Sequence, residues 1–253
     1  FATFRDEEES QRYVEVMVKA LEAGVQHPKL FKSPQGYLHK ITADSVQIRL
    51  CVMEKIDGNS FYEKNLKATT DEMRFLVQQA ALINKIDLKP KPVYDSWAIV
   101  HFLEEYKKKR KYLNENDTKF IDPLADQFSA IEIGELPHCF VHGDIIKTNV
   151  IRDKNGKLYI TDFSVSSYYP RVQELAVLLC NMLFDEDKPD TFPEYYKLAL
   201  EEYQSHNELT REEIKALPLF VRVAHVMHIL CATFEKKANK NDTAENEYWI
   251  NLG

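Results

Sequence analysis

Apolar residues recur at helical spacing near the start of the chain. The spacing i, i+3, i+4, i+7 is followed by Val14, Met17, Val18 and Leu21. This pattern places one apolar stripe along a helix. Gly24 suits the end of that helix, because glycine readily adopts the left-handed backbone that closes a helix. We therefore expect an amphipathic helix that buries this stripe.

A second helix is expected directly after Thr69. Thr69 and Glu72 have the spacing of a capping box, in which each side chain accepts a hydrogen bond from the other residue's main-chain N–H. The apolar positions that follow at helical spacing are Met73, Leu76, Val77, Ala80 and Ile83. A helix of about four turns should therefore follow the cap.

The rest of the chain is mostly helical in pattern. Helical spacing resumes over residues 96–113 and 117–133. From residue 171 to the end almost every segment has it, and the positions where we expect breaks are Pro189, Ser205 and Pro218.

Strand patterns occupy only a few short segments. "GYLHKIT" (36–42) and "VQIRLCVM" (46–53) predict a hairpin, and "HCFV" (138–141) predicts a short strand. Asn155-Gly156 is a strong turn signal between "NVIR" and "KLYIT" and predicts a second hairpin. The expected fold is α+β with two lobes: an N-terminal lobe at 1–57 and a helical C-terminal lobe at 58–253.

Composition and charge narrow the class of protein. Hydrophobic residues make up 44% and charged residues 29%, as in soluble globular proteins. We find no secretory signal and no apolar run that approaches the length of a membrane span. The net charge of −7 disfavours nucleic acid as a partner and mildly favours a cationic or neutral small substrate. Four widely separated cysteines argue against a zinc site and suit a reducing cytoplasm.

Polar residues gather around the second hairpin. His142, Asp144 and Asn149 precede it, and Asp162 follows its second strand. The tight turn should bring Asn149 and Asp162 together at the open end, where Asp144 arrives from the preceding loop. Two oxygen ligands for magnesium beside a carboxylate that orients a hydroxyl are what phosphoryl transfer from ATP requires. Alternatively, each residue alone could cap a turn or end a strand.

This arrangement resembles the aminoglycoside phosphotransferase and choline kinase family, which is related to protein kinases. The shared pattern is His-Gly-Asp, four residues, Asn, then a hairpin and Asp; here it spans "HGDIIKTN" and "ITDF". The resemblance implies a protein-kinase-like fold with Asp144 as the catalytic base or orienting group. It also implies that Asn149 and Asp162 bind magnesium.

Other segments extend the resemblance over most of the chain. "CVMEKIDG" resembles the hinge between the lobes, so the main chain of Met53, Glu54 and Ile56 would bind adenine. "AALINKID" and "YYPRVQELAVLL" resemble further family segments, with Asn84 in place of a common histidine and Glu174 in place of a common aspartate.

Glu15 matches the helix glutamate that pairs with the family's phosphate-binding lysine. A solvated helix charge is an equally good interpretation of Glu15, because the same helix carries other glutamates. The lysine should lie on the strand before this helix, but the first lysine is Lys19, and none of the seven glycines forms a G-x-G loop. Residues 1–4 have the pattern of a strand end. We therefore expect the phosphate-covering hairpin and its lysine to precede Phe1.

Other motifs leave alternatives open. His225 and His228 form H-x-x-H, which suits either a metal site or helix packing. Tyr248 and Trp249 suit either a cation cage or the core. No A-P-E segment follows "DFS", and residues 168–170 lead directly into helical patterns, which disfavours a protein kinase and favours a cleft for small acceptors.

These observations predict an ATP- and magnesium-dependent phosphotransferase that acts on a hydroxyl group of a small molecule. The alternative is a kinase-like scaffold or regulator that binds nucleotide without catalysis.

Overall fold

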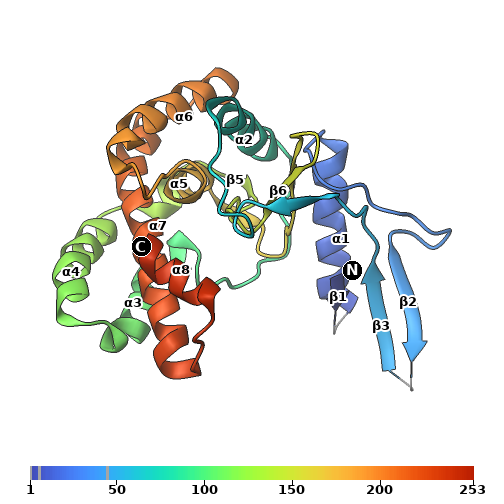
Figure 1. Ribbon diagram of the computed structural model, residues 1–253, viewed down its shortest axis with the longest axis horizontal. Coiled ribbons are helices and arrows are strands. Elements are labelled where there is room, and N and C mark those ends of the chain that lie inside the picture. The colour runs from blue at the N-terminus through green and yellow to red at the C-terminus, as the bar shows by residue number, and fades with distance from the viewer. Residues whose placement is uncertain (1, 5–6, 44–45) are drawn as a thin grey trace.

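The molecule has a small, sheet-containing N-terminal part and a larger, mostly helical C-terminal part (Figure 1). The computed structural model describes residues 2–4, 7–43 and 46–253. The prediction of an α+β fold is confirmed. In Figure 1 the N-terminal sheet and α1 lie on one side of the molecule, and the helices α3 to α8 lie on the other.

The N-terminal sheet has the strand order β1-β3-β2, and all its strands are antiparallel. Its strands are β1 (Ala2–Phe4), β2 (Leu38–Ala43) and β3 (Val46–Cys51). The hairpin predicted from the two β-rich runs is therefore confirmed, and β1 adds a strand on the other side of β3.

Helix α1 (Glu7–Glu22) packs against this sheet, but its buried face differs from the prediction. The apolar residues buried along α1 are Tyr13, Val16, Met17 and Ala20. Val14, Val18 and Leu21 are only partly buried against the same core. The buried face is therefore rotated slightly from the predicted stripe, of which only Met17 is fully buried. The reason is that α1 contacts both the sheet and the C-terminal part. Gly24 has a φ of 86° just after α1, as expected.

The C-terminal part is built mainly of helices. They are α2 (Thr70–Ile83), α3 (Phe102–Lys109), α4 (Glu115–Ser129), α5 (Val172–Asn181), α6 (Phe192–His206), α7 (Arg211–Asn239) and α8 (Ala244–Leu252). Short 3-10 turns are η1 (Ile99–His101), η2 (Arg110–Tyr112), η3 (Ile133–Glu135) and η4 (Pro189–Thr191). Both bonds of the Thr69–Glu72 capping box are present at the start of α2.

Helix α7 corrects two expectations. The break predicted near Pro218 is wrong, because Pro218 lies inside a continuous helix. Buried neighbours such as Leu217 and Phe220 pack α7 into the core, and this packing offsets the hydrogen bond that proline removes. An 18-residue window of α7 has a mean hydropathy of 1.6, so one apolar run does reach spanning length. That window is 61% buried within the protein, as expected of a core helix.

Two small sheets lie in the C-terminal part. The first has the order β4-β6-β7, with β4 (Gly58–Ser60), β6 (Val150–Asp153) and β7 (Leu158–Ile160); the second pairs β5 (His138–Val141) with β8 (Ser167–Pro170). The predicted hairpin at Asn155-Gly156 is confirmed. Residues 168–170 form β8 before the next helix begins, which the sequence pattern did not predict.

Strand β4 depends on a glycine. A Cβ atom at Gly58 would lie 2.3 Å from the main-chain oxygen of Arg152, so only glycine permits this close pairing of β4 with β6. Residues 58–60 are therefore paired with the C-terminal part. The lobe boundary after residue 57 stays a prediction.

The segment after α1 connects the two parts through main-chain bonds and a buried histidine. Ile160 N–H donates to the Gln26 oxygen (2.8 Å), and Gln26 N–H donates to Gln79 Oε1 (2.7 Å). His27 is 3% exposed, and its ring contacts Phe163 at 5.5 Å between centroids. Burial lowers the pKa of His27 to about 4. The imidazole is therefore neutral in the folded state.

We expect the protein to lose stability as the pH falls from about 6.5 towards 4. The unfolded chain takes up a proton at His27 in this window, whereas the folded protein does not, so protonation favours unfolding by up to about 3 kcal/mol. Urea denaturation at pH 7 and pH 4.5 measures the effect. His27→Leu and His27→Gln should each reduce the pH dependence, and His39→Leu, which removes an imidazole that is only partly buried, should retain it. An unchanged acid dependence in both His27 variants would contradict this assignment.

Candidate active site

The loop between β5 and β6 carries the His-Gly-Asp motif, and the ring of His142 stabilises this loop through contacts at both of its nitrogens. The ring is buried, with Nε2 3.1 Å from the Thr161 main-chain oxygen. Its Nδ1 accepts the main-chain N–H of Asp144 at 3.1 Å. Burial lowers the pKa of His142 to about 4, so the neutral ring can accept at Nδ1 and donate at Nε2. His142 therefore supports the loop and faces away from solvent.

Glu174 on α5 holds the same loop from the other side. Its buried Oε2 accepts the main-chain N–H groups of His142 (2.6 Å) and Gly143 (3.2 Å). Asn84, at the end of α2, donates to the Phe140 oxygen at 3.0 Å and so holds the strand that enters the loop. Asn84 and Glu174, which replace the family's common histidine and aspartate, therefore contact β5 and the loop that follows it. Burial raises the pKa of Glu174 to about 7.

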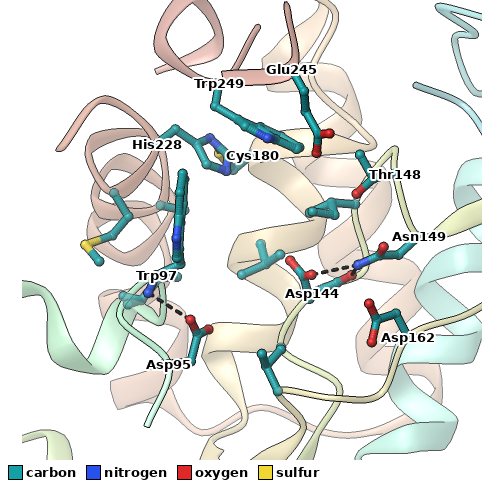
Figure 2. A pocket seen from close by; sticks show the side chains of 17 residues that line it. Asp95, Trp97, Asp144, Thr148, Asn149, Asp162, Cys180, His228, Glu245 and Trp249 are labelled. Atoms are coloured by element: carbon teal, nitrogen blue, oxygen red, sulfur yellow. Dashed lines mark hydrogen bonds between the residues drawn. The ribbon is translucent and has the colours of Figure 1, made fainter. Parts of the chain in front are cut away.

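The structure brings Asp144, Asn149 and Asp162 to one end of a cavity (Figure 2). Asn149 Nδ2 donates to Asp144 Oδ2 at 2.6 Å and to the Asp144 main-chain oxygen at 3.1 Å. The Asn149 main-chain oxygen accepts from Thr161 N–H at 2.9 Å, which places Asp162 beside it. The β6–β7 hairpin brings Asn149 and Asp162 together at its open end, as expected from the turn at Asn155-Gly156.

The backbone of Asp162 is left-handed, with a φ of 62°. Aspartate tolerates this conformation better than most residues, although it remains less stable than the right-handed regions. It turns the side chain away from the β7 direction and towards the cavity, where Figure 2 shows it beside Asn149. Tyr13 of α1 is close by, since burial and the Asp162 carboxylate together raise its pKa.

Negative charge accumulates around Asp144. Burial raises the pKa of Asp144 to about 8, and the charges of Asp95 and Asp162 add to the increase, whereas the Asn149 hydrogen bond opposes it. A cation bound nearby would stabilise the ionised carboxylates. The cavity is therefore suited to positively charged ligands.

The residues present fit a magnesium ion. The Asn149 amide nitrogen is used on Asp144, which leaves its oxygen for another ligand. An amide oxygen and the Asp162 carboxylate are hard donors of the kind magnesium prefers, and phosphate oxygens would complete the shell. Within the described ranges no group of three or more His, Cys, Asp or Glu side chains could hold a metal. Magnesium commonly needs only one or two protein ligands of this kind.

The cavity has a volume of about 410 Å³ and extends from Asp144 towards α7 and α8. Asp95 and Trp97, in the connector before α3, line it together with Trp249 of α8. Neither Asp95 nor Trp97 was singled out from the sequence. Helical spacing was expected from residue 96, but the first helical turn begins at Ile99, so Asp95 and Trp97 lie in an irregular connector that the pattern did not predict.

The structure distinguishes between the alternatives left open for the two motifs near the C-terminus, His225/His228 and Tyr248/Trp249. His225 Nδ1 lies 2.9 Å from the Leu252 main-chain oxygen, whereas His228 packs its ring on Trp249 at 5.1 Å between centroids. The two histidines therefore serve helix packing. Trp249 lines the cavity, but Tyr248 faces Lys147, with 5.7 Å between its ring centroid and the lysine Nζ. The pair does not form one cage.

The residues expected to contact nucleotide lie outside this cavity. Met53 forms a β-bridge with Leu30, and the Glu54 N–H donates to the Lys29 oxygen at 2.8 Å. Ile56 follows in the same connector. Their role in adenine binding stays a prediction.

Glu15 is exposed on α1 and lies beside β2, in a separate hollow lined by Tyr37 and Lys40. The structure does not bring it to Asp144. Its pairing with a phosphate-binding lysine stays a prediction.

Arg12 connects α1 to the turn that carries Asp162 and was not found from the sequence. Its buried guanidinium donates to the main-chain oxygens of Lys91 (2.8 Å), Ser164 (3.0 Å) and Ser166. These bonds join α1, the connector to Asp95 and the segment after Asp162. An arginine among polar helix residues carries no sequence signal for such a contact.

The model of the phosphotransferase enzyme family matches residues 2–212. No curated protein sequence matches the chain.

Several solved structures that match most of this chain are small-molecule kinases by name. An amicoumacin kinase in complex with AMP-PNP, Ca²⁺ and its ligand is 18% identical, with a TM-score of 0.66 over 97% of this chain and 76% of that one. A microcompartment-associated aminopropanol kinase is 13% identical (TM-score 0.68; 99% and 82% covered). A Plasmodium vivax ethanolamine kinase is 14% identical (TM-score 0.62; 98% and 71% covered). The predicted protein-kinase-like fold is confirmed.

We expect Glu174→Ala to destabilise the protein by about 2–4 kcal/mol, because it leaves two buried N–H groups without an acceptor. Glu174→Gln keeps an acceptor oxygen and should stay within about 1 kcal/mol of the wild type. Urea denaturation measures both, with Glu201→Ala on the exposed face of α6 as a control. Equal stability of Glu174→Ala and wild type would show that Glu174 does not support the loop.

Proposed function

The chain belongs to the phosphotransferase enzyme family, and we propose that it transfers the γ-phosphoryl group of ATP, with magnesium, to a hydroxyl group of a small molecule. Family membership and the structural neighbours support a small-molecule phosphotransferase. The observation that carries the finer proposal is the convergence of Asp144, Asn149 and Asp162 at one end of the cavity.

Asp144 is the group that accepts the proton of the acceptor hydroxyl. As the acceptor oxygen forms a bond to the γ-phosphorus, the bond from phosphorus to ADP breaks, and the hydroxyl proton moves to Asp144 Oδ. Burial raises the pKa of Asp144, so its ionised form is a stronger proton acceptor than an ordinary carboxylate, and a cation bound nearby would keep it ionised. The bond from Asn149 fixes the carboxylate in one orientation.

Asn149 Oδ1 and the Asp162 carboxylate would hold magnesium. When bound, the ion neutralises charge on the phosphates during transfer. The amicoumacin kinase structure contains AMP-PNP and Ca²⁺, which supports a nucleotide and a divalent metal in this proposal.

The nucleotide would lie between the lobes, whose boundary we place after residue 57. Adenine would contact the main chain at Met53, Glu54 and Ile56, and Glu15 would pair with the lysine that binds phosphate. We place the enzyme in the cytoplasm, because the four cysteines are free in the structure.

The first test of this proposal is Asp144→Asn. The change preserves the shape of the side chain but removes the proton acceptor, so kcat should fall by about 10²–10⁴-fold with little change in the KM for ATP. Steady-state kinetics of the full-length protein on a demonstrated acceptor measures this, with the surface change Asp190→Asn as control. A kcat within a few-fold of wild type would remove Asp144 from the mechanism.

The second test is Asp162→Ala, which removes the only carboxylate proposed to bind magnesium. We expect the variant to lose the magnesium-dependent part of its ATP affinity and to keep the magnesium-independent part. Calorimetric titration with ATP, with and without magnesium, separates the two, and Asp190→Ala at an exposed position is the matched control. The same magnesium dependence in Asp162→Ala and wild type would make Asp162 only a structural turn residue. If wild type binds magnesium-ATP but phosphorylates no acceptor, the alternative of a nucleotide-binding scaffold holds.

A further inference from the structure

Arg12 of α1 donates three hydrogen bonds to main-chain oxygens of the C-terminal part. Its exposed fraction is 7%, and its acceptors are the oxygens of Lys91 (2.8 Å), Ser164 (3.0 Å) and Ser166. Each acceptor takes a different nitrogen of the guanidinium, namely Nε, Nη1 and Nη2 in that order. The planar fork of arginine therefore matches three fixed carbonyl groups, which a single ammonium nitrogen could not reach together.

The guanidinium keeps its positive charge in this buried position. Burial lowers the pKa of Arg12, and the nearby charge of Glu9 opposes the decrease, but an arginine side chain stays protonated at neutral pH in either case. Hydrogen bonds from a charged donor are stronger than those between neutral groups, and little water competes for a buried donor. The three bonds of Arg12 are therefore among the strong contacts between α1 and the C-terminal part.

The two serine oxygens belong to the turn that follows Asp162. Asp162 has a left-handed backbone, with a φ of 62°, which is less stable for aspartate than the right-handed regions. Within the turn, Ser164 N–H donates to Asp162 Oδ1 at 3.2 Å, and Ser166 N–H donates to the Phe163 oxygen at 3.3 Å. Both bonds are long and the first is exposed to water, so they stabilise the turn only weakly.

Other contacts fix the chain before the turn but not after it. Thr161 N–H and Oγ1 donate to the Asn149 oxygen at 2.9 Å and 3.0 Å, so the residue before Asp162 is held in place. The ring of Phe163 is buried in the core. Packing of this ring fixes its position but does not by itself direct the main chain that follows, and this is the part of the chain that Arg12 binds.

We infer that Arg12 is a positioning residue for Asp162: it holds the turn at Ser164 and Ser166 so that the Asp162 carboxylate faces the cavity, and it thereby raises the affinity for magnesium (Figure 2). This inference rests on the proposed function, in which Asp162 is a magnesium ligand. Arg12 itself does not line the cavity. Helix α1 therefore influences the metal site from outside it.

The alternative is that Arg12 only attaches α1 to the C-terminal part. In that case its removal lowers the stability of the protein, but the molecules that remain folded bind magnesium as before. Magnesium affinity measured on the folded protein therefore distinguishes positioning from attachment.

The test compares the full-length wild type with Arg12→Met, which keeps an unbranched apolar stem and removes all three donors. Calorimetric titration with ATP at a series of magnesium concentrations gives the concentration at which half of the magnesium-dependent gain in ATP affinity is reached. We expect this concentration to rise about 5- to 30-fold, because Arg12 no longer holds the less stable backbone of Asp162. ATP affinity without magnesium should stay within about threefold of the wild type.

Hydrogen–deuterium exchange tests the turn without metal or nucleotide. In Arg12→Met, the main-chain amides of residues 162–167 should exchange at least about fivefold faster than in the wild type, because the turn opens more often. The amides of the core helix α7 should keep their exchange rates.

Three further variants complete the comparison. Arg74→Met removes an exposed arginine that pairs with Glu202, and it should change neither readout. Phe128→Leu reduces a buried ring on α4, so it should lower Tm but leave the magnesium dependence within about twofold. Arg12→Lys keeps the charge on one nitrogen and should shift both readouts less than Arg12→Met, in the same direction. It replaces Arg12→Met in the test if that variant does not fold.

Three results would overturn the inference while the proposed function stands. The first is a wild-type magnesium dependence in the Arg12 variant together with a lower Tm, which would show attachment alone. The second is an equal shift in Phe128→Leu, because loss of stability would then explain the effect. The third is unchanged exchange at residues 162–167 in the Arg12 variant.

If ATP binding to the wild type does not depend on magnesium, the proposed function fails, and hydrogen–deuterium exchange decides the inference separately. Faster exchange at residues 162–167 in the Arg12 variant, with wild-type exchange in Phe128→Leu, would support the positioning of Asp162. Unchanged exchange would overturn it.

Discussion

The candidate active site depends on one buried carboxylate. Glu174 accepts the main-chain N–H groups of His142 and Gly143 and so fixes the start of the loop that carries Asp144. Gly143 has a φ of 82°, so the chain turns sharply between the strand β5 and Asp144. Glu174 lies on α5, which packs on the core helix α7, so its hydrogen bonds attach the loop to the helical part. These bonds position Asp144 through the main chain of the two residues before it.

The charge of the cavity follows from this geometry. Fixing Asp144 beside Asp95 and Asp162 concentrates negative charge in a partly desolvated space, and the raised pKa of Asp144 is the consequence. Carboxyl groups placed so close together lower the stability of the folded state unless a cation is bound. Sites that bind cations often have this property. Stability and ligand binding are thus linked at the same carboxyl groups.

The small N-terminal part is coupled to this site through α1. Arg12 and Tyr13 are neighbours on that helix, and they reach the two sides of the turn at Asp162. The guanidinium bonds to Ser164 and Ser166 are charge-assisted and at least partly buried, so movement of α1 would move the segment that follows Asp162. This contact gives the N-terminal part a direct influence on the proposed metal site.

Local features could be predicted from the sequence because neighbouring residues determine them. The capping box at Thr69, the turn at Asn155-Gly156 and the grouping of Asn149 with Asp162 depend on bonds made within a few residues or across one hairpin. The uninterrupted course of α7 through Pro218, the rotation of α1, and the places of Asp95 and Arg12 could not be predicted in this way. They depend on packing and on hydrogen bonds between residues far apart in the chain, such as Arg12 and Ser164. The grouping of Asp144, Asn149 and Asp162 could therefore be predicted from the sequence, whereas the other side chains around them became known only from the folded chain, because burial is a property of the whole fold.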